Sequence, residues 1–194
     1  CIGLRYFNIF GPKQDPNGAY AAVIPKFINL MIKKKQPTIN GDGTFSRDFT
    51  YVDNAVQANY LALTTTNNDA FGEAFNIGIE GQVTILEMFN IINNHLSYDI
   101  EPILGNNRDG DIPHSNANIN KARTVLRYSP LVLFEEGIIK TIEYYCKKEL
   151  KRLLLEDIDY NKLLNRKPID INLTDTNDFL NNKQILITGG CGSI

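Results

Sequence analysis

A short apolar run near the start of the chain most constrains how this sequence can fold. Residues 2–7 are apolar at nearly every position, which is typical of a parallel strand buried on both faces. The run stops at Asn8, and the Gly11-Pro12 pair that follows breaks regular structure. Ligands bind outside the carboxyl ends of strands in open α/β sheets. The sequence therefore predicts an α/β fold with the Asn8 amide at a binding site.

The composition is that of a globular protein, and the charge limits the possible partners. The chain has 194 residues, of which 43% are hydrophobic and 22% are charged, enough for a sizeable core. A formal net charge of -2 gives no long-range attraction for nucleic acid or for an anionic membrane. Nucleic acid is therefore not an expected partner, and phosphate recognition would depend on individually placed Arg or Lys residues.

The cysteines and the apolar runs indicate a cytoplasmic protein without a metal site or a membrane span. Cys1, Cys146 and Cys191 are far apart, and none belongs to a Cys-x-x-Cys pair. This spacing argues against a disulfide framework and against a zinc site. No apolar run approaches the roughly 18 residues that a membrane-spanning helix needs. We therefore expect a reduced, cytoplasmic location.

Periodic segments and turn signals predict an alternation of helices and strands. Thr84 followed by Glu87 predicts a capping box at one helix start, and Asp53 and Asn54 predict the cap of another. Pro25 indicates a helix that begins or kinks there. The expected helices cover residues 19–35, 55–63, 85–96, 118–127 and 133–147, and the expected strands cover residues 37–40, 45–52, 74–79 and 101–104.

The chain changes character after residue 147. Residues 148–182 are first charged and leucine-rich, then polar and turn-prone, so we expect a connector. Residues 183–194 contain a short apolar strand that runs into a turn with Gly189 and Gly192. This pattern predicts the first strand and turn of a dinucleotide-binding domain, where a helix amino terminus faces a pyrophosphate. A glycine loop after an unrelated strand is the alternative.

Several motifs in a fixed order resemble one family of enzymes. They are Arg5-Tyr6-Phe7-Asn8, the block from Asp15 to Pro25, Asn40-Gly41-Asp42-Gly43, Ser46-Arg47-Asp48-Phe49, Val52-Asp53-Asn54 and Arg108-x-Gly110-Asp111-x-x-His114-Ser115. Residues 1–147 resemble the carboxyl-terminal half of the extended short-chain dehydrogenase/reductases, the NAD-dependent epimerases and dehydratases of nucleotide sugars. They are most similar to bacterial UDP-N-acetylglucosamine 4-epimerases of surface-polysaccharide pathways. The resemblance implies the substrate-binding half of a Rossmann-type fold, with an incomplete sheet.

The end of the chain resembles a different group of nucleotide-sugar enzymes. Asp157-Ile158, Leu163-Leu164-Asn165-Arg166-x-Pro168 and the glycine turn are similar to the entry of the catalytic domain in membrane-linked nucleotide-sugar 4,6-dehydratases. Residues 183–194 would then be the start of a second, truncated Rossmann domain. The chain would join the tail of one nucleotide-sugar enzyme to the head of another.

The resemblance divides the implied site between two halves. NAD would bind in an amino-terminal half, and the UDP-sugar would bind mainly to residues 1–147. A diphosphate needs bidentate cationic partners, which the guanidinium groups of Arg47 and Arg108 provide. Tyr6 and Phe7 would border the nicotinamide, and Gly189 and Gly192 would approach the cofactor of the second domain. The implied substrate-binding residues are Asn8, Val23, Ile24, Thr38, Asn40, Arg47, Arg108 and Asp111.

The polar residues of this implied site also have simpler interpretations. Arg47 could form a surface ion pair with the neighbouring Asp48, and Arg108 could be solvated in a polar loop. Asn8 could cap the end of its strand, and Asp111 could stabilise a turn.

For the complete protein, the resemblance implies a homodimeric epimerase that interconverts UDP-N-acetylglucosamine and its galacto epimer through a 4-keto sugar. The family's catalytic Tyr and Lys, with a helping Ser or Thr, are expected before Cys1, so this chain alone would be inactive. A nucleotide-sugar dehydratase or decarboxylase and a non-catalytic UDP-sugar binding or assembly module are the alternatives. We also expect poor stability of the chain alone, because its first strand would have an unpaired edge.

Overall fold

The computed structural model describes residues 1–17, 22–107 and 110–156. The chain divides into two units, Cys1–Leu153 and Leu154–Ile194. The elements are β1 (Gly3–Tyr6), β2 (Ile9–Phe10), α1 (Val23–Ile32), β3 (Thr38–Asn40), β4 (Ser46–Arg47), β5 (Thr50–Tyr51), α2 (Val52–Thr64), the 3-10 helix η1 (Asn68–Ala70), β6 (Ala74–Ile77), β7 (Val83–Thr84), α3 (Ile85–His95), β8 (Ile103–Gly105), β9 (His114–Ser115), α4 (Asn120–Val125) and α5 (Phe134–Glu156).

Four small sheets, most of them parallel, form the β part of the first unit. β1 pairs with β6, β2 with β5 and β3 with β8, each pair in parallel. β4 lies between two strands, parallel to β9 and antiparallel to β7. Because strands and helices alternate along the chain, the predicted α/β class is confirmed for the described residues.

The first strand is parallel, but the prediction that it is buried on both faces is wrong. Gly3, Arg5 and Tyr6 are exposed, and Leu4 is only half-buried. Within the described part of the chain β1 has one neighbour, β6, in which Phe75 lies opposite Leu4. The other edge of β1 therefore presents unpaired backbone groups.

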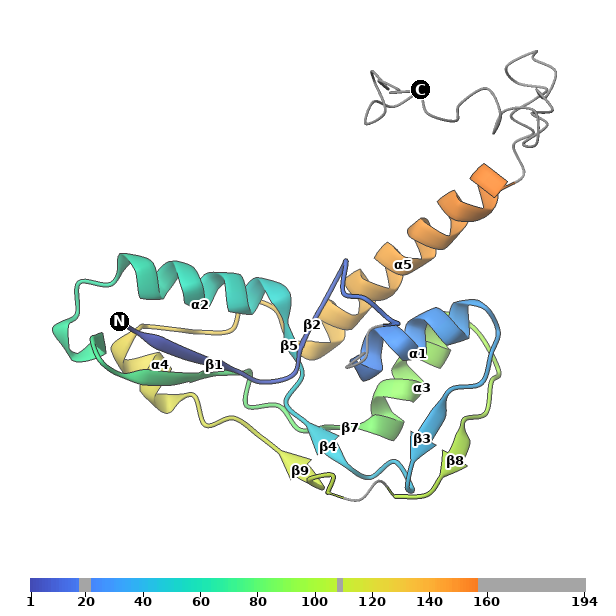
Figure 1. Cartoon of the computed structure of the whole chain (residues 1–194), viewed down its shortest axis with the longest axis horizontal. Helices are drawn as coiled ribbons and strands as arrows, with labels where there is room; N and C mark the ends of the chain where they lie inside the picture. Colours follow the sequence, from blue (N-terminus) through green and yellow to red (C-terminus); the bar gives the residue numbers. More distant parts are fainter. Residues whose placement is uncertain (18–21, 108–109, 157–194) are drawn as a thin grey trace, which may run out of the picture. The chain divides into compact units, whose positions relative to one another are not determined.

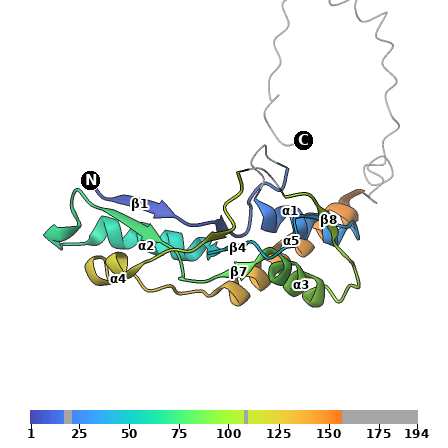
Figure 2. The ribbon, with the colours of Figure 1, turned by 90° about the horizontal axis from the view of Figure 1, so that it is seen from below.

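Three helices share the larger hydrophobic core. α1, α3 and the start of α5 lie next to one another in both ribbon views (Figure 1 and Figure 2). Four aromatic rings extend this core, with centroid distances from 5.5 Å for Phe49 and Phe134 to 6.4 Å for Phe10 and Phe49. The buried faces of the helices have helical spacing; they carry Ile24, Phe27, Ile28, Met31, Met88, Phe89, Ile92, Ile138, Ile142 and Tyr145.

A second core joins β1 and β6 to α2 and α4. Phe75 of β6, Ala58 of α2 and Ala122 of α4 are fully buried in it. Tyr128 also belongs to this core, and its hydroxyl donates a hydrogen bond of 3.0 Å to the carbonyl oxygen of Gly78. Burial raises the pKa of the Tyr128 phenol, so the hydroxyl remains a donor.

Two predicted helix caps have opposite outcomes. The capping box of α3 is confirmed: the Thr84 hydroxyl accepts from the backbone N–H of Glu87 at 3.1 Å, and the Glu87 carboxylate accepts from that of Thr84 at 2.8 Å. The predicted cap of α2 is wrong, because Tyr51 occupies the cap position. Asp53 lies in the first turn instead, and Asn54 is buried inside the helix.

The last helix is longer than the sequence predicts. α5 runs from Phe134 to Glu156, so the predicted boundary after residue 147 falls inside it, and the compact unit extends to Leu153. None of the helices in the described ranges is both long and apolar enough to cross a membrane. The predicted turn with Gly189 and Gly192 lies outside the described residues.

Candidate functional site

One cavity brings together most of the residues that the resemblance implies for substrate binding. Its volume is about 200 Å³. Ile24 does not line it, because this side chain is buried in the core, and Arg108 lies outside the described residues. Since the lining residues are far apart in the sequence, the fold is what brings them together. The other six of the eight implied residues line the cavity: Asn8, Val23, Thr38, Asn40, Arg47 and Asp111.

Asn8 follows the end of β1 in a left-handed backbone conformation, with a φ of 37°. Asn is among the few residues that tolerate this conformation. The side-chain amide of Asn8 donates to the backbone carbonyl oxygen of Asp48 at 3.4 Å. The backbone carbonyl oxygen of Asn8 accepts a hydrogen bond from the backbone N–H of Thr50. The residue thus connects the end of β1 to the β4–β5 segment while it lines the cavity.

Arg47 is held by backbone carbonyl groups and not by a carboxylate. Its Nη1 atom donates to the carbonyl oxygen of Ser46 at 2.8 Å and to that of Pro113 at 3.2 Å. No ion pair joins it to Asp48 in the part of the chain that the structure describes, so the surface ion-pair interpretation is wrong. Since a guanidinium has several N–H donors, Arg47 has donors left for a ligand in the cavity.

Asp48 is buried next to the site residues and was not among the predicted functional residues. Its carboxylate accepts hydrogen bonds of 3.0–3.1 Å from the backbone N–H groups of Ile79, Glu80 and Ala117. It therefore connects the β4–β5 segment to the loop after β6 and to the segment before α4. Burial raises the pKa of this carboxyl group, and the backbone donors oppose the rise.

The segment that carries Asp111 is fixed beside β4. β9 pairs with β4, and the Ser46 hydroxyl oxygen lies 2.8 Å from Nδ1 of His114. Ser46 is buried, and its backbone N–H donates to the carbonyl oxygen of Pro113. Asp111 itself is exposed at the cavity. These contacts give its loop a defined position relative to Arg47.

Apart from Val23, the apolar lining of the cavity was not predicted. Phe27 lies one helical turn after Val23, and Ile39 lies between Thr38 and Asn40, so both were close to predicted residues. Sequence patterns do not separate such residues from ordinary core residues, because Phe27 and Ile39 are buried in the core as well. The apolar lining residues besides Val23 are Phe27, Ile39, Phe45, Phe49 and Ile85.

Tyr6 and Phe7, the residues implied to border the nicotinamide, do not line this cavity. Tyr6 is exposed, and its hydroxyl accepts from the Asn59 side-chain amide at 2.7 Å. It lines a separate cavity of about 460 Å³, together with the exposed Leu63 and Phe71. Phe7 packs against the second core. The structure therefore does not bring the two side chains together at one site.

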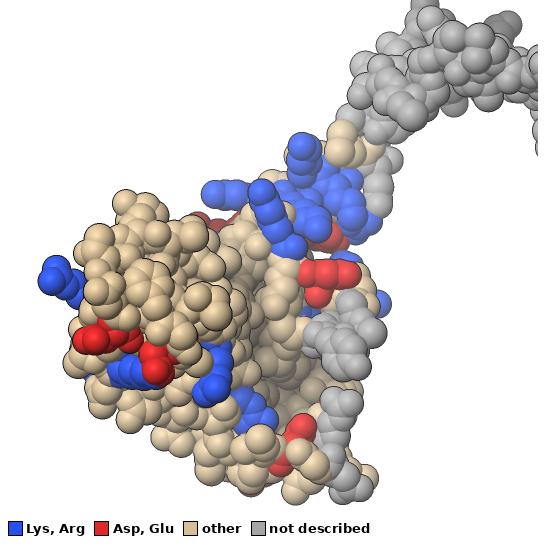
Figure 3. Space-filling view, turned by 60° about the vertical axis from the view of Figure 1, so that its left-hand side comes forward, with Lys and Arg blue, Asp and Glu red and all other residues tan. Residues whose placement is uncertain are grey.

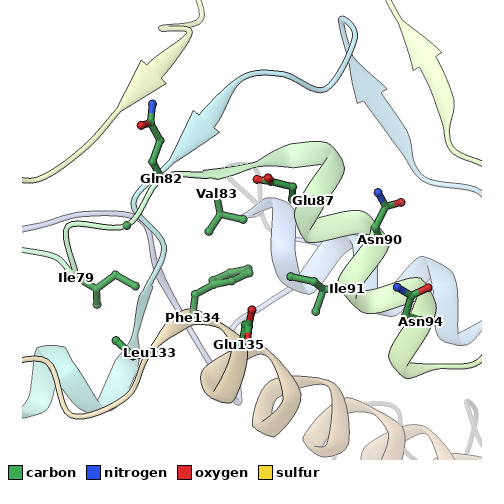
Figure 4. Close-up of a pocket in the computed structure, with 11 residues that line it drawn as sticks. Ile79, Gln82, Val83, Glu87, Asn90, Ile91, Asn94, Leu133, Phe134 and Glu135 are labelled. Carbon is green, nitrogen blue, oxygen red and sulfur yellow. The ribbon is translucent and has the colours of Figure 1, made fainter.

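A larger cavity of about 730 Å³ contains none of the implied residues (Figure 4). It lies between α3, the start of α5 and the loop before β7. Glu87 in its lining already belongs to the capping box of α3. The cavity has two carboxylates and no cationic side chain, so it does not suit a diphosphate. Its lining includes Ile79, Gln82, Val83, Glu87, Asn90, Ile91, Asn94, Leu133, Phe134 and Glu135.

A comparison with known protein families identifies the family of this chain. Residues 1–78 match the NAD dependent epimerase/dehydratase family. The chain belongs to this family. The match includes Asn8, Arg47 and the β3 segment, which lie at the 200 Å³ cavity described above.

Similar proteins act on several nucleotide sugars. A putative UDP-glucose 4-epimerase from Methanocaldococcus jannaschii is 36% identical over 141 residues, which cover 73% of this chain and 44% of that protein. A UDP-N-acetyl-alpha-D-glucosaminuronate decarboxylase from Bacillus cytotoxicus is 34% identical over 153 residues, with coverages of 75% and 46%. The UDP-N-acetylglucosamine 4-epimerase from Methanobrevibacter ruminantium M1, solved with UDP-N-acetylmuramic acid, has a TM-score of 0.69 and 38% identity, with coverages of 75% and 46%. The chain therefore spans about half the length of these relatives.

The described residues of this epimerase/dehydratase family member do not fit NAD by themselves. A dinucleotide pyrophosphate binds where a glycine-rich turn leads from a strand directly into a helix. In the described ranges, the turn at residues 41–43 leads to β4 and the one at residues 78–81 leads to β7. Gly189 and Gly192 lie outside these ranges. The same ranges contain no cluster of His, Cys, Asp or Glu that could hold a metal ion.

Proposed function

We propose that this chain is the carboxyl-terminal, substrate-binding half of a UDP-sugar 4-epimerase. The observation that carries the proposal is the single cavity lined by Asn8, Arg47 and Asp111 together with residues of α1 and β3. These are the residue types that a nucleoside diphosphate requires, and they lie in a chain of the matching family.

Two observations favour the carboxyl-terminal half. β1 is parallel to its one described partner and its other edge is unpaired, which suits a strand that further strands of the same sheet would extend. The family's catalytic Tyr and Lys are four residues apart, and among the described residues this spacing occurs at Tyr144 and Lys148 of α5. Neither residue lines the candidate cavity. The catalytic pair would therefore come from the other half of the protein, and this chain alone would be inactive.

The cavity offers complementary groups to the nucleotide end of the substrate. Arg47 would donate to the diphosphate oxygens through its planar guanidinium group. In the described structure β3 pairs with β8 along one edge, so the backbone groups of Thr38 and Asn40 on the other edge would bind the edge of the uracil ring. Asp111 would accept from ribose hydroxyl groups. A volume of about 200 Å³ suits part of a UDP-sugar, so the other half would enclose the rest.

The reaction would be shared between the halves. NAD, when bound, supplies hydride removal from C4 of the sugar and hydride return to its opposite face. The residues of this chain would hold the UDP group and present the sugar ring to the catalytic Tyr and Lys of the other half. The block from Asp15 to Pro25 supports UDP-N-acetylglucosamine and UDP-N-acetylgalactosamine as the pair that is interconverted.

A nucleotide-sugar decarboxylase is the second candidate. The 34% identity to a UDP-N-acetyl-alpha-D-glucosaminuronate decarboxylase favours it, at nearly the identity of the epimerase relative. Product analysis of the complete protein separates the two: UDP-N-acetylgalactosamine from UDP-N-acetylglucosamine supports the epimerase. Release of carbon dioxide from UDP-N-acetylglucosaminuronate contradicts the epimerase proposal. Formation of only a 4-keto-6-deoxy sugar from UDP-N-acetylglucosamine also contradicts it. Absence of turnover with retained UDP binding would support a non-catalytic module.

The substrate site is tested by UDP binding to the full chain in a calorimeter. Arg47→Ala removes the charge-assisted contact to the diphosphate, so we expect roughly ten- to hundredfold weaker binding. Arg47→Lys keeps the charge and loses the bidentate geometry, so its effect should be intermediate. Arg5→Ala is the matched control, because Arg5 is exposed and lines none of the cavities described above. Equal affinities of the folded Arg47→Ala and unchanged proteins would contradict the proposed site.

A further inference from the structure

A concentrated basic surface lies where α1 ends and α5 extends beyond the core. Figure 3 shows blue Lys and Arg side chains crowded together toward the top of that view. The hydrogen bond from Arg152 lowers the pKa of the Glu149 carboxyl on α5, and the charge of Lys33, which directly follows α1, lowers it further. Lys33 therefore lies near this part of α5. Seven of the 20 Lys and Arg residues of the chain form this basic surface: Lys33, Lys34, Lys35, Lys147, Lys148, Lys151 and Arg152.

Few acidic side chains oppose these cations. On the same part of α5, Glu149 pairs with Arg152 at 2.6 Å, and Glu143 lies one turn before Lys147. Lys34 lies over the Tyr98 ring at 5.6 Å from its centroid. Within the described ranges no ion pair involves Lys147, Lys148 or Lys151. The surface therefore carries more positive than negative side chains, although the whole chain has a net charge of -2.

The same part of α5 also exposes leucines. Up to Tyr145 the helix buries one face in the larger core, and from Cys146 to Leu155 no side chain is buried. Leu150 is 59% exposed and Leu153 is 47% exposed. Cys146, Leu150 and Leu153 follow one another at helical spacing, so they form an apolar stripe beside Lys147 and Lys151.

We propose that this surface docks the protein onto an anionic lipid bilayer. An amphipathic helix with apolar side chains flanked by lysines binds in the plane of such a membrane, where the lysines face the lipid headgroups and the leucines enter the acyl boundary. The charge of the whole chain does not prevent this, because ionic screening limits electrostatic attraction to about 10 Å and the local cations dominate at that range. The exposed leucines favour a bilayer over nucleic acid, which offers phosphates but no apolar layer.

Vesicle co-sedimentation of the full chain tests the proposal. The probes are vesicles of phosphatidylcholine alone and vesicles with equal amounts of phosphatidylcholine and phosphatidylglycerol. We expect binding to the anionic vesicles and little binding to the neutral ones. Raising the salt concentration should weaken the binding, because it screens the lysines.

Two variants separate the cationic and apolar contributions. Replacing Lys147, Lys148 and Lys151 by Ser, or Leu150 and Leu153 by Ser, should each weaken binding to anionic vesicles by about tenfold or more. The matched controls are Ser replacements of Leu131 and Leu133, which are 65% and 64% exposed elsewhere, and of the exposed Lys26, Lys121 and Lys140. We expect these controls to bind like the unchanged protein.

Four results would overturn the proposal. The first is equal binding to neutral and anionic vesicles, or none to either. The second is loss of binding in the controls to the same extent as in the α5 variants. The third is that neither kind of vesicle binds the chain, whereas heparin binds the unchanged chain and the leucine variant equally. This result would assign the surface to nucleic acid or another polyanion. A dimer lost only in the leucine variant, without vesicle binding, would likewise assign the stripe to a second copy of the chain.

Discussion

At the residue scale, the buried side-chain amide of Asn54 fixes the position of a distant loop. Its side-chain oxygen accepts from the backbone N–H groups of Leu131 and Val132 at 2.8 and 3.0 Å, and its amide nitrogen donates to the carbonyl oxygen of Val132 at 2.7 Å. Asn54→Leu keeps the size and removes all three bonds. Each buried group left unpaired costs about 1–3 kcal/mol, so we expect a loss of unfolding free energy of about 3 kcal/mol or more in urea titration.

The matched control for this prediction is Asn90→Leu. Asn90 is an exposed asparagine in the middle of α3, and among the described residues its side chain has no hydrogen bond. A surface substitution of this kind changes stability by about 0.5 kcal/mol or less. Similar losses in the two variants would mean that the Asn54 bonds do not stabilise the fold.

Gly78 carries a second prediction, because the chain passes very close to the site scaffold there. A Cβ atom on Gly78 would lie 2.6 Å from a carboxylate oxygen of Asp48 and 2.5 Å from Cβ of Ala117. Gly78→Ala should therefore displace the buried carboxylate and destabilise the protein by roughly 1–3 kcal/mol, as overpacking does. Thermal unfolding measures the effect. Gly3→Ala is the control, since its nearest neighbour would be at 3.4 Å, and an equal shift in both variants would contradict the prediction.

The candidate site was predicted from motifs, whereas its supporting contacts were not. Asn8, Arg47 and Asp111 stand in sequence patterns that carry a resemblance, so their convergence on one cavity could be anticipated. Asp48 and Asn54 act through backbone groups of segments that are 31 to 78 residues away. The spacing of residues within one segment does not indicate such contacts. An Asp or Asn before a helix equally suggests a cap. Hydrogen bonds between distant segments are therefore what sequence patterns missed.

At the scale of elements, the start of α3 follows directly from local sequence. Thr84 and Glu87 satisfy each other's backbone N–H groups. Thr84→Ala should lower the free energy of unfolding by about 1 kcal/mol, because a cap is lost. Thr84→Ser, which keeps the hydroxyl, is the control and should remain close to the unchanged protein. Urea titration that finds no difference between the Ala and Ser variants would exclude a stabilising cap.

The same capping box predicts a dependence of stability on pH. The hydrogen bonds from Thr84 lower the pKa of the Glu87 carboxyl below its usual value of 4.5. A carboxyl whose pKa is lower in the folded state stabilises that state at pH values above its unfolded pKa, and the stabilisation is lost as the pH falls through the folded pKa. The stability difference between the unchanged protein and Glu87→Gln should therefore shrink below about pH 4.5. A difference that is the same at pH 7 and pH 3 would contradict this assignment.

The ends of elements were less predictable than their order. α5 continues to Glu156 although its buried face ends at Tyr145, because its last turns contain leucine, lysine and glutamate, all good helix formers. The predicted boundary after residue 147 was based on a change of composition. This change ends the buried face of the helix, but the backbone remains helical. The end of the buried face therefore does not predict where the helix ends.

At the scale of the whole molecule, exposed apolar surface surrounds the unpaired edge of β1. Cys1, Ile2, Leu4 and Tyr6 line one cavity with Ala62, Leu63 and Phe71 of the neighbouring segments. On α2, Tyr60 is 65% exposed and Leu63 is 85% exposed. A free strand edge beside such a surface favours association with other chains. The chain alone is therefore expected to aggregate, and the other half that we propose for the protein would cover this surface.

Leu63→Lys tests this expectation without touching the cores. The added charge on the exposed side of α2 should oppose association, so we expect less light scattering on heating and little change in circular dichroism at low temperature. Leu131→Lys is the control, because Leu131 is also highly exposed, at 65%, but lines none of the cavities described above. If the unchanged chain is a monomer with a cooperative thermal transition, or if both variants suppress scattering equally, the β1–α2 surface is not the cause. If Leu63→Lys alone suppresses scattering, the β1–α2 surface is the one through which the chains associate.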